Sequence, residues 1–213
     1  MSVPIQRLGE QFEDLAKQNH AARLAMWVFL ASEILLFAAL FALYAAYRAM
    51  YPDDFALAAA HNNVAIGTIN TFILITSSAT VALALWAVRG GLTRLASGLL
   101  LFSIGCGVLF LVLKGIEYGQ HFREGIYPGM GYRSAELTGQ GARLFFSLYY
   151  LITGLHAFHV VAGLSVLGWL AAGTVRGRFG PENHLRFELG TLYWHLVDIV
   201  WIFVWPLLYL LHR

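Results

Sequence analysis

The sequence predicts an all-α, polytopic membrane protein: a single domain over residues 1–213, built as a bundle of five transmembrane helices. Hydrophobic residues make up 59% of the chain and charged residues 12%, whereas soluble domains carry about 25% charged residues. The mean hydropathy is +0.65, and long apolar stretches separate the few charges. This composition excludes a disordered chain, a coiled coil and a soluble nucleic-acid-binding protein.

The first two predicted spans lie in apolar stretches longer than the roughly 20 residues that cross a bilayer. The first lies between Arg23 and Arg48 and is interrupted only by Glu33. The second lies between Asp54 and Arg89, a stretch that contains no Asp, Glu, Lys or Arg. Because lipid offers no partner for unpaired backbone groups, runs of this length predict helices.

The last three spans are built on the apolar stretches Arg94–Lys114, Arg143–Arg176 and Glu188–Arg213, the last interrupted only by Asp198. None shows the alternating, roughly ten-residue rhythm of an outer-membrane barrel. The five predicted spans cover residues 24–48, 64–88, 95–121, 144–175 and 188–211.

The segments between and before the spans contain turn and surface signals. Pro52, Pro128 and Pro181 fall in the predicted loops, where a fixed backbone angle is tolerated. Hydrophobic residues at helical spacing predict a short helix on the membrane surface ahead of the first span: Ile5, Leu8, Phe12 and Leu15.

Small residues in the third and fourth spans are expected to let helices approach closely. Helix association in lipid depends on tight packing, because lipid tails are as apolar as the side chains. These small residues are Ser97, Gly98, Gly105, Gly107, Gly163, Ser165 and Gly168.

The Lys and Arg residues outside the spans predict the orientation, since they concentrate on cytoplasmic loops. One side carries eight: Arg7, Lys17, Arg23, Arg89, Arg94, Arg176, Arg178 and Arg186. The other carries six: Arg48, Lys114, Arg123, Arg133, Arg143 and Arg213. Segment 1–23 is therefore predicted to be cytoplasmic and the C-terminus to lie outside.

Five ionisable residues are predicted to share one layer in the inner half of the bilayer: Glu33, His156, His159, His195 and Asp198. They come from three spans, and two i, i+3 pairs each share a helix face. Ionisable groups at membrane depth are functional candidates. Three interpretations remain open for this layer: hydrogen bonds between helices, a proton-holding role for Glu33, and a metal site.

A second polar cluster lies near the outer end of the third span, where Lys114, Glu117 and His121 occupy one helix face. Known metal patterns do not fit either cluster. No Glu is followed three residues later by His, as di-metal bundles require, and the outer layer supplies only one histidine for a haem. The sequence also contains no arrangement typical of a nucleophilic catalyst. We therefore predict neither catalytic residues nor a metal site, and the net charge of +2 predicts no nucleic-acid partner.

The last span contains a distinctive run of aromatic and polar residues. Phe187-Glu188 is followed, after four residues, by Tyr193-Trp194-His195-Leu196-Val197-Asp198-Ile199-Val200-Trp201. This run resembles the signature of the cytochrome c oxidase subunit III family. Other family elements occur in the same order: Ser32-Glu33, Asn70-Thr71, Glu117-Tyr118 and Gly154-Leu155-His156-Ala157-Phe158-His159-Val160.

The resemblance implies a cofactor-free subunit that packs beside oxidase subunits I and II, whose haem and copper reduce oxygen, and that binds phospholipids. Glu33 matches the family glutamate that hydrophobic carbodiimides modify. Ser32-Glu33 lies in the first span, so the chain resembles the short bacterial form, which lacks the two leading helices of long members. The implied location is the bacterial inner membrane.

The predicted function is that of an accessory, non-catalytic subunit that stabilises the catalytic subunit and supports proton uptake. Lipid-binding candidates are Arg176, Arg178 and Glu188, and the alternative for the two arginines is ordinary charge flanking a span. Within the family, a quinol oxidase or a nitric oxide reductase context is equally compatible. Outside it, the alternative is an independent proton- or ion-coupled transporter that uses Glu33 and Asp198.

Overall fold

The computed structural model describes residues 13–128, 132–133 and 137–211, and these residues contain helices and no β-strand. Five of the helices are long and apolar enough to cross a membrane, which confirms the predicted all-α, five-span fold class. The elements are α1 (Leu15–Met50), α2 (Pro52–Ala60), α3 (Val64–Arg89), α4 (Thr93–Arg123), α5 (Gln140–Val175), α6 (Leu185–Trp205) and the π-helical turn η2 (Pro206–Leu210).

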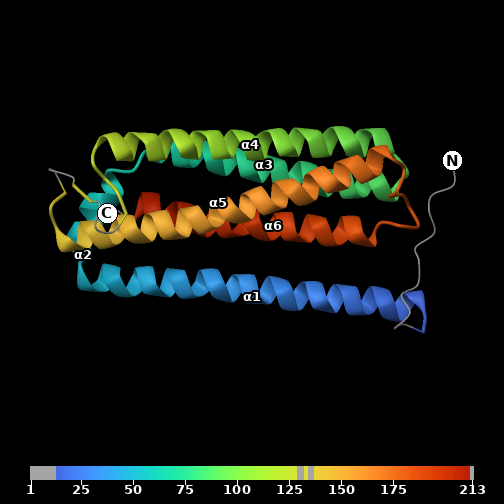
Figure 1. Ribbon diagram of the computed structural model, residues 1–213, viewed down its shortest axis with the longest axis horizontal. Helices are drawn as coiled ribbons and strands as arrows, with labels where there is room; N and C mark the ends of the chain where they lie inside the picture. The colour runs from blue at the N-terminus through green and yellow to red at the C-terminus, as the bar shows by residue number, and fades with distance from the viewer. Residues whose placement is uncertain (1–12, 129–131, 134–136, 212–213) are drawn as a thin grey trace.

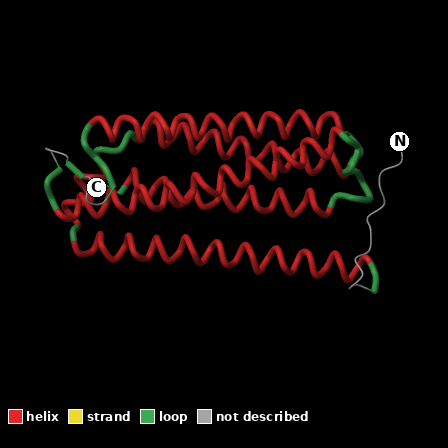
Figure 2. The backbone as a smooth tube through the Cα atoms, viewed as in Figure 1, coloured by secondary structure: helices red, strands yellow, loops and turns green. Residues whose placement is uncertain are grey.

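The long helices run alongside one another, and the connecting loops gather at the two ends of the bundle (Figures 1 and 2). Helices α3, α4, α5 and α6 pack together, whereas α1 packs on α5 and α6 at one side. Only 11% of the most apolar window of α1 is buried, compared with 56% of the window in the last span. Helix α1 therefore presents most of its surface outward.

Glycine permits the closest helix contacts of the bundle. A Cβ atom added at Gly163 of α5 would lie 2.7 Å from the Trp194 ring of α6, and one at Gly107 of α4 would lie 2.6 Å from Leu164 of α5. A larger residue at either position would force neighbouring side chains to shift, in agreement with the close approach that the small-residue pattern predicted. At Gly98, Gly105 and Gly168, in contrast, an added Cβ meets no atom within 4 Å, so these glycines do not serve helix packing within the chain.

Two segments differ from the sequence-based expectation. Helix α1 begins at Leu15, nine residues before the predicted span, because the Asp14 side chain accepts a hydrogen bond from the Lys17 backbone N–H and caps the helix. The region of Pro52 is not a loop: Pro52 begins the short helix α2, since its missing N–H costs nothing at a first helical position. Of the predicted surface helix, residues Ile5, Leu8 and Phe12 lie outside the described part of the chain.

The final span changes its winding at Pro206, where α6 gives way to η2. Two side chains from other elements bind backbone carbonyls of this turn. The Tyr44 hydroxyl of α1 donates to the Leu207 carbonyl at 2.8 Å, and Asn62 Nδ2 donates to the Leu208 carbonyl at 3.0 Å. The turn thereby connects the end of the last span to α1 and to the loop before α3.

Candidate functional site

The ion pair with the deepest burial joins Lys114 and Glu117 on α4. Lys114 Nζ donates to Glu117 Oε2 at 2.7 Å, and the two side chains are 5% and 1% exposed. Two tyrosines complete the group. Lys114 Nζ also donates to the hydroxyls of Tyr149 and Tyr209 at 2.8 Å each, while Tyr209 donates to Glu117 Oε1 at 2.7 Å. The charges are thus satisfied internally, and they connect α4 to α5 and to η2.

His121 lies one turn beyond Glu117 on the same buried face of α4, as its spacing predicted, but it does not join the ion pair. Its ring packs on the rings of Phe146 and Tyr149 at 5.4 and 5.3 Å between centroids. Beside it, His61 Nε2 lies 2.7 Å from Glu124 Oε2. No spacing pattern pointed to Tyr149 or His61, because Tyr149 lies on another helix and His61 lies in a loop.

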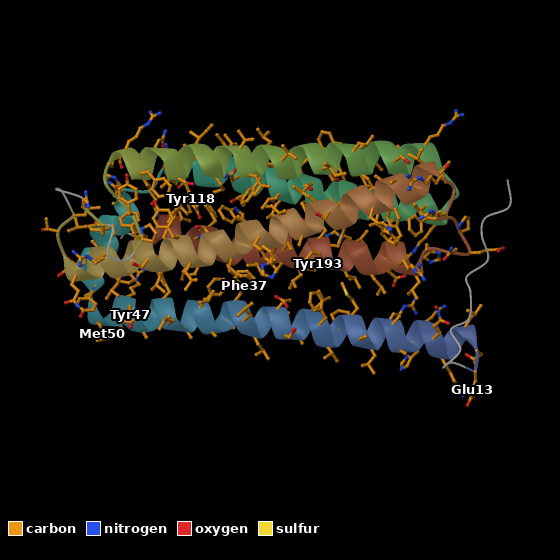
Figure 3. The ribbon with its side chains drawn as sticks, viewed as in Figure 1. Glu13, Phe37, Tyr47, Met50, Tyr118 and Tyr193 are labelled. Carbon is orange, nitrogen blue, oxygen red and sulfur yellow. The ribbon has the colours of Figure 1, made fainter. Side chains whose placement is uncertain are left out.

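The inner polar layer contains one acid–histidine contact between helices. His159 Nε2 of α5 lies 2.9 Å from Glu33 Oε2 of α1, and the two side chains are 9% and 17% exposed. Phe37 points from α1 toward α5 (Figure 3), and its ring lies 5.2 Å from that of His159. This pair therefore lies at the seam between α1 and the rest of the bundle.

The hydrogen bonds of His159 determine how many protons the pair holds. His159 Nδ1 lies 2.8 Å from the Leu155 carbonyl oxygen. A carbonyl only accepts, so Nδ1 carries a hydrogen. The short contact between Nε2 and Glu33 then requires another proton. Either an imidazolium donates to a carboxylate or a neutral carboxyl group donates to an imidazole.

The remaining members of the predicted layer have separate surroundings. His195 Nδ1 lies 2.7 Å from the Ser78 hydroxyl of α3, and Asp198, 3% exposed, lies one turn further along α6 beside the same serine. His156 is fully buried among the rings of Phe110 and Trp201, and neither of its nitrogens has a hydrogen-bond partner among the described residues. The structure thus joins Glu33 to His159, but the five residues do not form one continuous hydrogen-bonded network.

The family model described as cytochrome c oxidase subunit III matches residues 13–212. The chain belongs to the cytochrome c oxidase subunit III family. Cytochrome c oxidase subunit 3 of Thermostichus vulcanus is 30% identical over 191 residues, which are 89% of this chain and 87% of the relative. The subunit 3 of Marchantia polymorpha is 32% identical over 144 residues, or 66% of this chain, and the match spans about half (48%) of that relative.

A fused relative carries the same family segment. The heme-copper oxidase subunit I+III of Aeropyrum pernix is 31% identical over 198 residues, which cover 88% of this chain and 22% of that protein. Two of the pairs in the present subunit III family member, Lys114–Glu117 and Glu33–His159, include residues from the motifs that first suggested the family, Ser32-Glu33 and Glu117-Tyr118.

The three lipid-binding candidates of this subunit III chain differ in their contacts. Glu188 Oε2 lies 3.1 Å from Arg89 Nη2 and 3.4 Å from Arg23 Nη2, so its charge is shared with α3 and α1. Arg176 and Arg178, at the end of α5, are exposed and form no salt bridge with any described residue. Within the described part of the chain, no group of three or more His, Cys, Asp or Glu side chains could hold a metal ion.

Proposed function

We propose that this chain is an accessory, non-catalytic subunit of a haem–copper terminal oxidase in a bacterial cell membrane. It assembles with subunits I and II, which carry the haem and copper, and it stabilises the catalytic subunit. The family match over residues 13–212 is the observation that carries the proposal. The Aeropyrum relative, named as a subunit I+III, supports a partnership of this segment with subunit I.

Three histidines inside the bundle favour placing haem and copper in the partner subunits. His159 uses both ring nitrogens in hydrogen bonds, and one nitrogen of His195 lies against Ser78. His156 is enclosed by aromatic rings. A haem or copper ligand needs a free imidazole nitrogen directed toward an open site.

We further propose that Glu33 and His159 hold a proton for the oxidase. The pair contains one shared proton in either of its forms, and the Glu33 side chain is 17% exposed at the edge of the bundle. Such a group can exchange its proton with water or with a partner subunit. The fully enclosed Lys114–Glu117 pair has no comparable access.

The orientation proposed from charge places segment 1–23 in the cytoplasm. The start of α1, the α3–α4 turn and the α5–α6 turn lie at the same end of the bundle (Figure 1). This end carries Arg23, Arg89, Arg94, Arg176 and Arg178, the enrichment expected of a cytoplasmic face.

The test is to purify the complex from its native membrane through a tag on this chain and to record its visible spectrum and subunit composition. Co-purification of a haem–copper subunit is the expected result. Copper in a second partner subunit, beside the haem–copper subunit, would indicate a cytochrome c oxidase. A haem–copper subunit without a second copper-containing partner would indicate a quinol oxidase, and a haem-containing partner without copper would indicate a nitric oxide reductase. Isolation of the chain without haem, combined with ion transport by the chain alone in liposomes, would contradict the proposal.

A further inference from the structure

Two polar side chains in the interior of the bundle have no hydrogen-bond partner among the described residues: Asn70 of α3 and His156 of α5. Both residues are fully buried, and both belong to motifs that first suggested the family. An amide group and an imidazole ring each donate and accept hydrogen bonds. Four buried polar atoms, two on each side chain, are therefore unpaired within the described part of the chain. Such atoms normally bond to protein or to ordered water.

The two side chains lie at one level of the bundle, which Trp201 of α6 marks. Trp201 Nε1 donates to Thr71 Oγ1 at 3.1 Å, and Thr71 follows Asn70 in the sequence. The His156 ring lies 5.1 Å from the Trp201 ring and 5.6 Å from the Phe110 ring of α4, measured between centroids. Helices α3, α4, α5 and α6 thus each contribute one residue to a four-residue layer: Asn70, Phe110, His156 and Trp201.

Asn70 and His156 occupy opposite corners of the four-residue layer. Helix α3 packs on α4 and α6, and α5 packs on the same two helices, so α3 and α5 face each other across the interior. Asn70 lies on the buried face of α3, and His156 lies on the buried face of α5. The two corners between them are aromatic, and Trp201 Nε1 is already bonded to Thr71. The layer therefore places donors and acceptors on opposite sides and supplies no partner between them.

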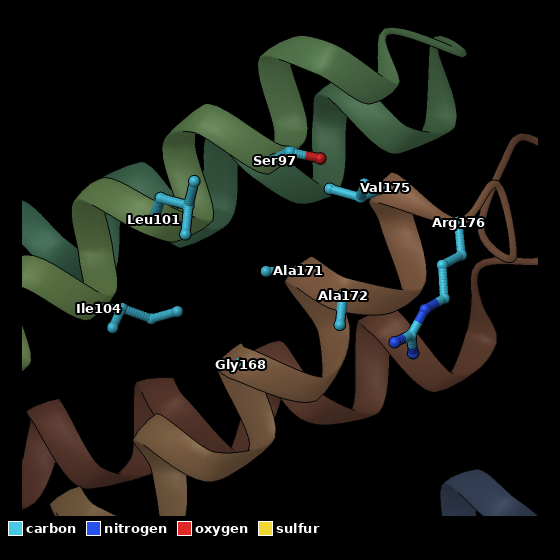
Figure 4. Close-up of a pocket in the computed structure, with 8 residues that line it drawn as sticks. All are labelled: Ser97, Leu101, Ile104, Gly168, Ala171, Ala172, Val175 and Arg176. Atoms are coloured by element: carbon cyan, nitrogen blue, oxygen red, sulfur yellow. The ribbon is translucent and has the colours of Figure 1, made fainter.

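The surroundings of the layer select water as the molecule that satisfies these atoms. A buried water makes about three hydrogen bonds to polar groups that lack other partners, whereas a structural metal ion needs about four ligands and the layer offers two side chains. The groove between α4 and α5 shown in Figure 4 does not reach the layer. Its polar lining residues, Ser97 and Arg176, lie roughly 20 Å or more along their helices from Phe110 and His156, at about 1.5 Å per residue.

We infer that Asn70 and His156 bind a buried water molecule that bridges α3 and α5. The water exchanges hydrogen bonds with the Asn70 amide group on one side and with a ring nitrogen of His156 on the other. The bridge joins the two helices across the interior of the bundle. Rotation of either helix would leave polar atoms unpaired in an apolar core, so the site favours a single packing arrangement. The inference goes beyond the proposed accessory role and does not depend on the identity of the oxidase partner.

The direct test is a cryo-electron-microscopy map of the purified complex at a resolution that shows ordered water. A density peak within hydrogen-bonding distance of both the Asn70 amide and the His156 ring is expected. Asn70→Leu, which keeps a similar size, should lose the peak. Thr71→Val is the matched control at the same level and should retain it. The inference would be overturned by a wild-type map without the peak, by direct contact between the two side chains, or by a peak that persists in Asn70→Leu.

Heating of the complex, followed by the release of this chain, tests the bridge independently. Asn70→Leu and His156→Leu should each lower the midpoint by about 2–4 °C, because each variant leaves the other side chain buried and unpaired. The double variant should recover much of this loss, since it removes all four polar atoms together. Without a bridging water, each single variant would remove unpaired polar atoms and raise the midpoint. A raised midpoint in the single variants, or additive losses in the double variant, would overturn the inference.

Discussion

Two largely buried pairs of ionisable side chains, Lys114–Glu117 and Glu33–His159, lie on membrane-spanning helices but differ in their access to the surroundings. Lys114 and Glu117 are enclosed by two tyrosine hydroxyls and are at most 5% exposed. Glu33 and His159 lie at the seam between α1 and α5, where the Glu33 side chain is 17% exposed. The hydrogen bonds described for the enclosed pair all go to side chains of this chain. For the pair at the seam, we propose that the greater exposure of Glu33 allows a proton to be exchanged.

The comparison also concerns how each pair is connected. Lys114 and Glu117 are three residues apart on one helix, and the tyrosines connect them to α5 and η2. Glu33 and His159 are 126 residues apart in sequence and join two helices directly. Because α1 has little buried surface, this bond is one of a small number of contacts that attach α1 to the bundle, together with the packing of Phe37 and the hydrogen bond of Tyr44.

The largest effect is expected from Lys114→Met. The substitution leaves the Glu117 carboxylate buried without its cation, which costs about 3–5 kcal/mol of stability. Thermal unfolding of the purified complex measures the loss. The double variant Lys114→Met/Glu117→Leu should recover much of it, since it removes both charges. A single variant as stable as the wild type would show that the pair is not enclosed.

A smaller effect is expected from His195→Leu, which removes the hydrogen bond to Ser78 while keeping a large apolar side chain. Hydrogen bonds between membrane helices contribute about 0.6–2 kcal/mol. Retention of the chain in the complex should weaken, and the haem spectrum should stay the same. Ser78→Ala is the matched control and should not add to the effect of His195→Leu. A spectral change would place this chain at the redox centre.

Glu188→Gln should lower the free energy of unfolding by less than the two preceding variants, by about 0.2–1 kcal/mol. Its ion pairs with Arg23 and Arg89 involve arginine side chains that are 53% and 50% exposed. Solvent and ions screen such pairs, so the difference between variant and wild type should shrink as salt increases. Unfolding measured at two ionic strengths tests this. A loss of stability as large as that of Lys114→Met would contradict the expectation that exposed ion pairs contribute less to stability than the enclosed pair.

The smallest effect on stability is expected from Glu33→Gln. The glutamine amide can donate to His159 Nε2, so the contact persists while the shared proton is lost. Assembly should therefore remain intact, and oxygen consumption by the complex should fall. His159→Leu, which removes the contact altogether, is the comparison variant. Failure of the Glu33→Gln complex to assemble would assign the pair a structural role and rule out proton holding.

The sequence motifs pointed to residues that the structure places in polar contacts, but they did not predict which of these residues contact one another. Spacing placed Lys114, Glu117 and His121 on one face of a helix, and in the structure Lys114 donates a hydrogen bond to Glu117. The second group was predicted only from the similar depth of its residues in the bilayer: Glu33, His156, His159, His195 and Asp198. Equal depth does not fix the direction of a side chain around its helix, and only Glu33 and His159 meet. The partners Tyr149, Tyr209 and Ser78 had no sequence signal, because hydroxyl groups are common on membrane helices.

The sequence by itself determined the all-α class, the five spans and the family motifs, since these depend on the apolar length needed to cross lipid and on local residue order. The tertiary structure decided which ionisable groups are paired, and which glycines pack and which remain open. These outcomes depend on the rotation and crossing of helices that are distant in sequence. In lipid, specific packing contacts set that geometry, and composition does not specify them.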